Sequence, residues 1–178
     1  MQKGFVLWLT GLPGSGKTTL TKRLEEILRK KGLKLEVFDG DEVRKWLSPE
    51  AGFSREDRER HIKRVAMISK LLSRNGIAVI VSLVSPYRSV RNFARNEIEN
   101  FLEIWIKCSV ETCIKRDPKG LYKKAQSGGI KDMTGVQDVY EEPRNPELII
   151  DTENNSVDEC IDTLIEELKK SRIIDENN

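Results

Sequence analysis

The chain has 178 residues, and its 31 Lys and Arg nearly balance its 29 Asp and Glu, for a formal net charge of +2. That length is typical of one domain, and the charge balance argues against a nucleic-acid partner, because domains that bind nucleic acids are usually strongly basic. The apolar run that begins at Phe5 is too short for a signal peptide or a membrane span, so we expect a cytoplasmic protein without a membrane partner.

Short β-branched runs alternate with amphipathic helical stretches along the chain. We expect a strand over 5–10, a helix that ends near Lys31 and Gly32, and a second strand over 35–38. A long helix over 55–75 leads into a third strand over 78–81. Two more strands are expected over 101–106 and 148–150, each followed by helical material.

The last helix carries a capping box, Ser156-x-x-Glu159, and an apolar stripe that should pack on the sheet: Val157, Ile161, Leu164, Ile165 and Leu168. Residues 175–178 are expected to be a frayed tail. The alternation predicts a three-layer α/β/α fold of the P-loop NTPase type, with a central five-stranded, mainly parallel sheet. One domain over 1–174 should place its ligand site at the carboxyl ends of the strands.

The strongest motif follows the first strand. Residues 11–18 match the P-loop (Walker A) pattern G-x-x-x-x-G-K-[ST] between a strand and a helix, the context that the motif requires. The backbone N–H groups and the helix N-terminus should bind phosphate, Lys17 should reach the β- and γ-phosphates, and Thr18 should bind Mg²⁺. The predicted ATP-binding residues here are Gly11, Leu12, Pro13, Gly14, Ser15, Gly16, Lys17, Thr18 and Thr19.

The carboxylates of the site are expected after the second strand. Many P-loop proteins place a metal-organising Asp at the end of a later strand, but here residues 82–85 read Ser-Leu-Val-Ser. Asp39 and Asp41 are the alternative, one to organise Mg²⁺ and the other to accept the proton of the attacking hydroxyl. We favour Asp39 for the metal and Asp41 for the base, although the residues alone leave the reverse order open, and an Asp at a helix start is also a common cap.

Several further segments extend the motif series: 39–44, 52–58, 85–88, 116–122, 140–143 and 146–151. With the phosphate loop, they resemble in order the motifs of adenosine 5'-phosphosulfate (APS) kinases, and the resemblance spans about 5–168. It implies an adenylylsulfate kinase of sulfate activation, which moves the γ-phosphoryl of ATP to the 3'-hydroxyl of APS with Mg²⁺. It also implies a homodimer.

The resemblance assigns acceptor contacts as well. Arg44 and Arg58 correspond to residues that bind the phosphosulfate and fix the ribose of APS, and Phe53 to the aromatic shelf beneath the APS adenine. Without the resemblance, Arg44 and Arg58 could equally be charged residues on the surface of helices, and Phe53 could be a core residue.

Two positions depart from the family pattern. His61 stands where the family usually has asparagine, which retains a donor and changes its pH behaviour, and Met133 stands where a phenylalanine closes over the acceptor adenine. Both belong to the expected APS contacts, together with Lys131. Residues 119–140, called the lid below, contain four glycines and no long apolar run, which favours a mobile cover over charged nucleotides.

The resemblance also places Arg116 against the ATP adenine, with Thr152 nearby. Ser85 lies in a segment to which the family assigns a phosphoserine intermediate and APS contacts. Direct in-line transfer is the simpler chemistry, because nothing in the sequence activates the Ser85 hydroxyl.

Two other functions stay open from the residues alone. The phosphate loop and the two aspartates would equally serve a kinase for another small metabolite, such as a sugar acid or a nucleoside monophosphate. The basic cluster around Arg55 to Arg64 is the only feature that favours a non-enzymatic nucleotide switch or nucleic-acid binder.

Overall fold

In the computed structural model, which describes residues 3–174, five parallel strands form one sheet in the order β2-β3-β1-β4-β5. The strands are β1 Val6–Thr10, β2 Leu35–Asp39, β3 Ala78–Ser82, β4 Phe101–Lys107 and β5 Leu148–Asp151. Each lies within about one residue of the bounds expected from the sequence, because each contains a short apolar run. The residues of β1 and β3 are all buried, whereas the edge strands β2 and β5 are partly exposed. The predicted three-layer α/β fold is thus confirmed.

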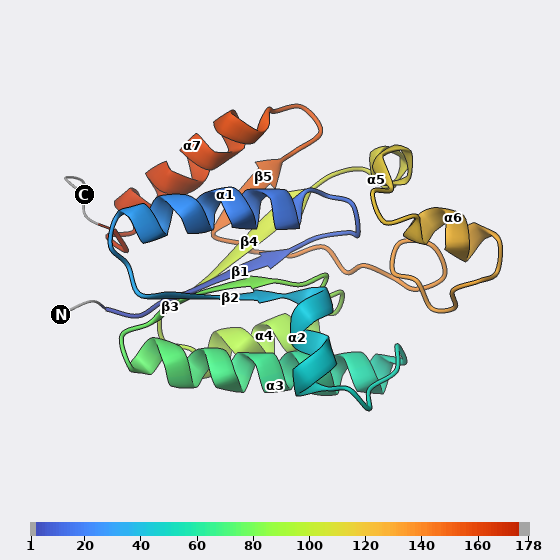
Figure 1. Cartoon of the computed structure of the whole chain (residues 1–178), viewed down its shortest axis with the longest axis horizontal. Helices are drawn as coiled ribbons and strands as arrows, with labels where there is room; N and C mark the ends of the chain where they lie inside the picture. Colours follow the sequence, from blue (N-terminus) through green and yellow to red (C-terminus); the bar gives the residue numbers. More distant parts are fainter. Residues whose placement is uncertain (1–2, 175–178) are drawn as a thin grey trace.

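Helices cover both faces of this sheet (Figure 1). They are α1 Lys17–Lys30, α2 Gly40–Leu47, α3 Arg55–Arg74, α4 Arg88–Glu97, α5 Val110–Arg116, α6 Leu121–Gln126 and α7 Val157–Lys170. α1 and α7 lie on one face, α3 and α4 on the other, and α5 and α6 lie beyond the carboxyl ends of the strands. Helices α2, α4 and α6 were not expected as separate elements. α2 and α6 are too short to show a clear helical period.

The side chains of β1 illustrate how the two cores form. Leu7 and Leu9 pack under α1 and α7, whereas Val6 and Trp8 pack under α3 and α4, and all four are fully buried. Alternate residues of a strand point to opposite faces. A strand whose side chains are apolar on both faces therefore becomes the centre of the sheet, and the loop that follows it becomes the centre of the site.

The last helix confirms most of its predicted stripe. The capping box is present, with Glu159 N–H donating to Ser156 Oγ and Ser156 N–H donating to Glu159 Oε2. Ile161, Leu164 and Leu168 are buried and Ile165 is partly buried. Val157, however, is 44% exposed and lines the cavity described below, so its assignment to the sheet-packing stripe was wrong. As the first helical residue, it projects past the end of the sheet. The predicted tail, 175–178, lies outside the described residues.

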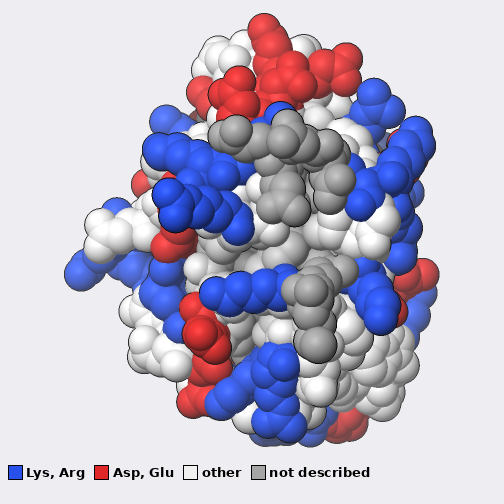
Figure 2. Space-filling model, turned by 90° about the vertical axis from the view of Figure 1, so that its left-hand side faces the viewer, with Lys and Arg blue, Asp and Glu red and all other residues white. Residues whose placement is uncertain are grey.

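Lys and Arg side chains surround the face near the amino ends of the strands (Figure 2). Three helices end toward this side of the molecule, and their last turns carry Arg29 and Lys30 of α1, Arg74 of α3, and Lys169 and Lys170 of α7. Cations at helix C-termini are stabilised by the helix dipole, so this distribution has a local cause. None of the described helices has the length and apolar character needed to cross a bilayer.

Candidate active site

The carboxyl ends of the strands open into a cavity of about 830 Å³. Residues that are distant in the sequence meet on its wall. Of those singled out from the sequence, the following line it: Pro13, Gly14, Gly16, Lys17, Thr18, Thr19, Asp39, Asp41, Phe53, Arg58, Arg116, Lys131, Met133 and Thr152. The ligand site is therefore at the edge of the sheet where the α/β topology placed it.

The phosphate loop connects β1 to α1, and its glycines are required by its shape. Gly14 and Gly16 have φ values of 79° and 98°, in the left-handed region that favours glycine. A Cβ at Gly11 would lie 2.5 Å from the carbonyl oxygen of Ile106. Gly16 is the N-cap of α1, so the free N–H groups of the first helical turn and the positive end of the helix dipole face the cavity.

Lys17 is the buried cation of this loop, with only 8% of its surface exposed. Its Nζ donates to the carbonyl oxygens of Gly11 at 2.9 Å and Leu12 at 2.8 Å. Burial lowers the pKa of Lys17 to about 8. The ammonium is thus held charged but poorly solvated near neutral pH, a state in which a phosphate anion is a favourable partner.

Thr18 and the two aspartates form the second part of the site. Thr18 Oγ1 donates to Asp39 Oδ2 at 3.0 Å, and Asp39 Oδ1 accepts the backbone N–H of Asp41 at 3.3 Å. Asp39 is therefore both the N-cap of α2 and a cavity residue, so the capping role and the site role coexist. A hydroxyl and a carboxylate oxygen are hard donors of the kind that Mg²⁺ prefers, and the pair fits that ion.

Lys119 and Ser82 are among the cavity residues that were not singled out from the sequence. Lys119 of the lid forms an ion pair with the carboxylate of Asp41, which lies 78 positions earlier in the chain. Ser82 is 4% exposed, pairs in register with Asp39 and Leu9, and its hydroxyl has no hydrogen-bond partner within residues 3–174. Lys119 could have been found from the sequence because it lies inside the 116–122 motif. Ser82 could have been found because it stands at the strand end where other P-loop proteins carry an aspartate.

Phe53 lines the cavity from the loop between α2 and α3, and it is 56% exposed, which excludes a core role. The guanidinium groups of Arg44 and Arg58 lie 4.9 Å and 5.5 Å from its ring centre. Arg58 also donates to the carbonyl oxygens of Phe53 at 2.8 Å and of Asp132 in the lid at 2.6 Å. Arg44 touches this ring without lining the cavity itself. An exposed aromatic ring flanked by two cations is a surface suited to a planar, anionic ligand.

The lid packs on the phosphate loop through a small apolar cluster. Met133 is 5% exposed and joins Leu12, Cys113, Tyr122 and Ala125 in that cluster. The Tyr122 hydroxyl donates to the carbonyl oxygen of Pro13 at 2.9 Å. The lid therefore covers the cavity in this structure, while its mobility stays a prediction.

Arg116 and Thr152 line the cavity next to the phosphate loop. Arg116 donates to the Thr152 carbonyl oxygen at 2.6 Å and to its hydroxyl at 3.2 Å, and the Thr152 hydroxyl donates to the carbonyl oxygen of Ser15 at 2.8 Å. Hydrogen bonds thus connect the end of α5 and the loop after β5 to the phosphate loop. Arg116 and Thr152 lie close together, as the sequence analysis expected.

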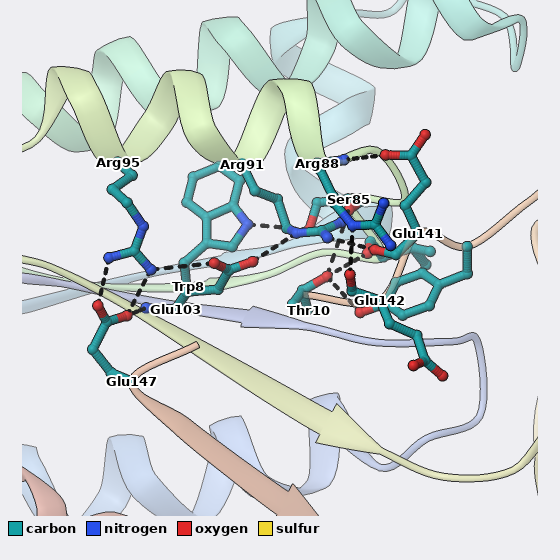
Figure 3. A network of polar contacts seen from close by, with 12 residues as sticks. Trp8, Thr10, Ser85, Arg88, Arg91, Arg95, Glu103, Glu141, Glu142 and Glu147 are labelled. Carbon is teal, nitrogen blue, oxygen red and sulfur yellow. Dashed lines mark hydrogen bonds and ion pairs between the residues drawn. The ribbon is translucent and has the colours of Figure 1, made fainter. Parts of the chain in front are cut away.

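Two residues expected at the acceptor site lie behind its wall instead. His61 is 2% exposed, its Nδ1 lies 2.9 Å from Ser48 Oγ between α2 and α3, and burial lowers its pKa to about 4. Ser85 is also 2% exposed, and its hydroxyl accepts the indole N–H of Trp8 at 3.1 Å (Figure 3). Neither is among the residues that line the cavity. The expected direct contacts of His61 and Ser85 with APS are therefore not supported by their positions.

A phosphate loop, an adjoining hydroxyl–carboxylate pair and an aromatic, cationic wall share one cavity. Together with the parallel sheet, they define a P-loop kinase, which binds a nucleotide and a small acceptor side by side.

Comparison with known proteins gives the family. Residues 3–151 match the sequence profile of adenylylsulphate kinase. A probable adenylyl-sulfate kinase from Aeropyrum pernix is 52% identical over 168 residues, or 92% of both chains. The structure of the Mycobacterium tuberculosis APS kinase in complex with AMPPNP and APS superposes with a TM-score of 0.90 at 36% identity, covering 95% of this chain and 99% of that one. The chain belongs to the adenylylsulfate kinase family, and it is an ATP-dependent kinase.

Other P-loop kinases share the fold alone. Shikimate kinase from Acinetobacter baumannii superposes over 97% of each chain with a TM-score of 0.61, at 14% identity.

Proposed function

We propose that this chain transfers the γ-phosphoryl group of ATP to the 3'-hydroxyl of APS, giving 3'-phosphoadenosine 5'-phosphosulfate and ADP. The observation that carries the proposal is the division of one cavity between the phosphate loop and the wall formed by Phe53 and Arg58. The M. tuberculosis relative, an APS kinase, is described with an ATP analogue and APS bound together, which supports the same division here.

On the nucleotide side, the phosphate loop binds the phosphates through its backbone N–H groups and Lys17. Arg116 and Thr152 border the adenine. Thr18 and Asp39 would hold Mg²⁺, which when bound supplies charge neutralisation of the transferring phosphoryl group. The contact between Thr18 Oγ1 and Asp39 Oδ2 supports this pairing of donors.

On the acceptor side, Phe53 stacks on the adenine of APS, and Arg44 and Arg58 balance its phosphosulfate charge. Lys131 and Met133 border the same space from the lid. Asp41 is the base that accepts the proton of the 3'-hydroxyl, and Lys119 of the lid forms an ion pair with its carboxylate at the cavity wall. Asp39 is engaged with Thr18, so this division of roles between the two aspartates agrees with their contacts.

Transfer is direct in this proposal. The Ser85 hydroxyl is buried and bonded to Trp8, without a general base among its hydrogen-bond partners. A covalent phosphoserine would need that hydroxyl to leave its place behind the wall, whereas an acceptor aligned in the cavity needs only in-line approach.

The test is ADP release from Mg-ATP with APS as acceptor, beside gluconate, shikimate and AMP. APS-specific turnover that is lost in both Lys17→Ala and Asp41→Asn variants is the expected result. Turnover with another acceptor alone would keep the kinase and overturn its substrate, and absence of turnover with all acceptors would overturn the function.

Two further expectations from the sequence remain proposals. The first is the cytoplasmic location. A homodimer rests on the family resemblance, and an APS kinase from Thiobacillus denitrificans, 29% identical with a TM-score of 0.74, is described as hexameric. Light scattering on the purified chain decides the assembly.

A further inference from the structure

A buried arginine joins three separate parts of the molecule behind the cavity wall (Figure 3). Arg91 of α4 is only 1% exposed. Its Nε donates to Glu103 Oε1 of β4 at 2.6 Å, one terminal nitrogen donates to the carbonyl oxygen of Ser85 at 2.6 Å, and the other donates to the carbonyl oxygen of Glu141. Each guanidinium nitrogen thus binds a different segment.

The first of these segments is the loop after β3, residues 83–87, called the wall loop because it contributes to the cavity wall. Ser85 has φ 38°, a left-handed conformation that costs about 1–3 kcal/mol in a non-glycine residue and persists only where the surroundings hold it. Trp8 binds its hydroxyl, Arg91 binds its carbonyl oxygen, and the Thr10 hydroxyl donates to the carbonyl oxygen of Val84 at 2.8 Å. Val84 itself lines the cavity. These bonds fix where that part of the wall stands.

The second segment, called the lid end, is 138–142, which comprises the last three residues of the lid and the two residues that follow it. Glu141 N–H donates to the carbonyl oxygen of Pro86 at 2.8 Å, and Arg88 N–H donates to Glu141 Oε2 at 2.8 Å. The Tyr87 hydroxyl donates to Asp138 Oδ2 at 2.6 Å. The lid end and the wall loop are thus bonded side by side, and Arg91 binds a carbonyl oxygen of each.

From these contacts we infer that Arg91 is a positioning residue for the acceptor: it sets the wall loop and the end of the lid relative to each other through the carbonyl oxygens of Ser85 and Glu141. Arg91 does not line the cavity, so it acts through the residues that do. A planar guanidinium with fixed donor directions can serve three segments at once, whereas a lysine ammonium, a point charge on a flexible stem, cannot reproduce that geometry.

The same network supplies a matched control. Arg95, one turn further along α4, donates to Glu103 Oε2 at 3.2 Å and pairs with Glu147. Within residues 3–174, it has no hydrogen bond or ion pair with the wall loop or the lid. Arg95→Lys therefore perturbs the same acidic cluster without touching the carbonyl oxygens of Ser85 and Glu141. Tyr140→Phe is a milder second variant, because it removes only the contact of 3.0 Å between the Tyr140 and Thr10 hydroxyls.

The kinetic test rests on the proposed function. Arg91→Lys keeps the positive charge opposite Glu103. It should raise KM for APS by about tenfold and change KM for ATP less than twofold, because the wall loop and the lid end are displaced while the phosphate loop is not. Arg95→Lys should change neither KM, and Tyr140→Phe should raise KM for APS by about two- to threefold. A variant that merely folds less well would lower the active fraction and leave both KM values unchanged, and that result would overturn the inference.

Hydrogen exchange on the unliganded protein tests the coupling without substrate. Amides within 82–88 and 138–142 should exchange about tenfold faster in Arg91→Lys than in the wild type, and both segments should change together. Unchanged exchange there, or equal acceleration in Arg95→Lys, would overturn the inference whatever the substrate is. Absence of APS-dependent turnover in the wild type would instead overturn the proposed function, and the exchange result would still decide the role of Arg91.

Discussion

The Thr18 hydroxyl donates a hydrogen bond of 3.0 Å to Asp39 Oδ2, across the gap between the start of α1 and the end of β2. The two residues lie 21 positions apart, and the parallel pairing of β2 with β3 and of β3 with β1 brings their strand ends to the same edge. Because both oxygens are hard ligands, their contact marks the place where a divalent cation would join the nucleotide phosphates.

The first prediction follows from this pair. Asp39→Asn removes the charge of the carboxylate and keeps its shape, so Mg²⁺ should strengthen ATP binding about tenfold less than in the wild type. The affinity for ATP in EDTA should change less than twofold. Calorimetric titration with ATP, with and without Mg²⁺, measures both, and Asp41→Asn is the matched control. A full Mg²⁺ effect in Asp39→Asn would place the metal elsewhere.

Lys17 gives a prediction about stability. Its pKa, lowered by burial to about 8, means that the folded protein holds the charged ammonium less favourably than the unfolded chain does. Lys17→Met should therefore raise the free energy of unfolding of the unliganded protein by about 1–3 kcal/mol at pH 7, even though catalysis is lost. Urea denaturation measures the difference.

The difference in stability between Lys17→Met and the wild type should depend on pH. Between about pH 8 and the unfolded value near 10.5, the unfolded chain binds a proton that folded Lys17 does not, so wild-type stability rises with pH there. The advantage of Lys17→Met should shrink over this window. An advantage that stays constant up to pH 10 would mean that burial of the ammonium is not its cause.

His61 predicts sensitivity to acid. Its pKa of about 4 is lowered by burial and by the positive charges of Arg44 and Arg64, against the opposing effect of Glu50. Between pH 6.5 and 4, His61 is protonated in the unfolded chain but not in the folded protein. The free energy of unfolding therefore falls as the pH falls through this range. His61→Asn, which can still bond Ser48, should remove about 2 kcal/mol of that loss. Parallel denaturation curves at pH 7 and 4.5 measure it; equal losses in both proteins would contradict the assignment.

The sequence predicted the fold well because the fold depends on local patterns. Each strand is a short apolar run, and each long helix has a clear stripe or cap, as Ser156 and Glu159 show in α7. Val157 was assigned wrongly because the apolar period alone does not show where the helix begins. A residue in the first turn extends past the sheet and does not pack on it.

Without the family resemblance, the candidate site was predictable only where its residues are neighbours in the chain. The phosphate loop and the Asp39–Asp41 segment carry their own geometry. The pair of Lys119 with Asp41 spans 78 positions, and the contact of Arg91 with Glu141 spans 50, so both depend on how crossovers bring distant loops together. Ser85 lies in a recognisable motif, but the sequence did not predict its left-handed backbone or its hydrogen bond with Trp8.

Ser85 also separates the two chemical routes. If transfer is direct, Ser85→Ala loses only the bond from Trp8 Nε1, so kcat should stay within about tenfold of the wild type and the free energy of unfolding should fall by about 1 kcal/mol. If a phosphoserine is obligatory, the variant loses its turnover while it remains folded. Steady-state rates with circular dichroism, and labelling of both proteins with γ-³²P-ATP, distinguish these results. Retained turnover without labelled protein assigns Ser85 to the wall that Arg91 holds, because a hydroxyl that serves as a fixed acceptor for an indole N–H has no part in the transfer itself.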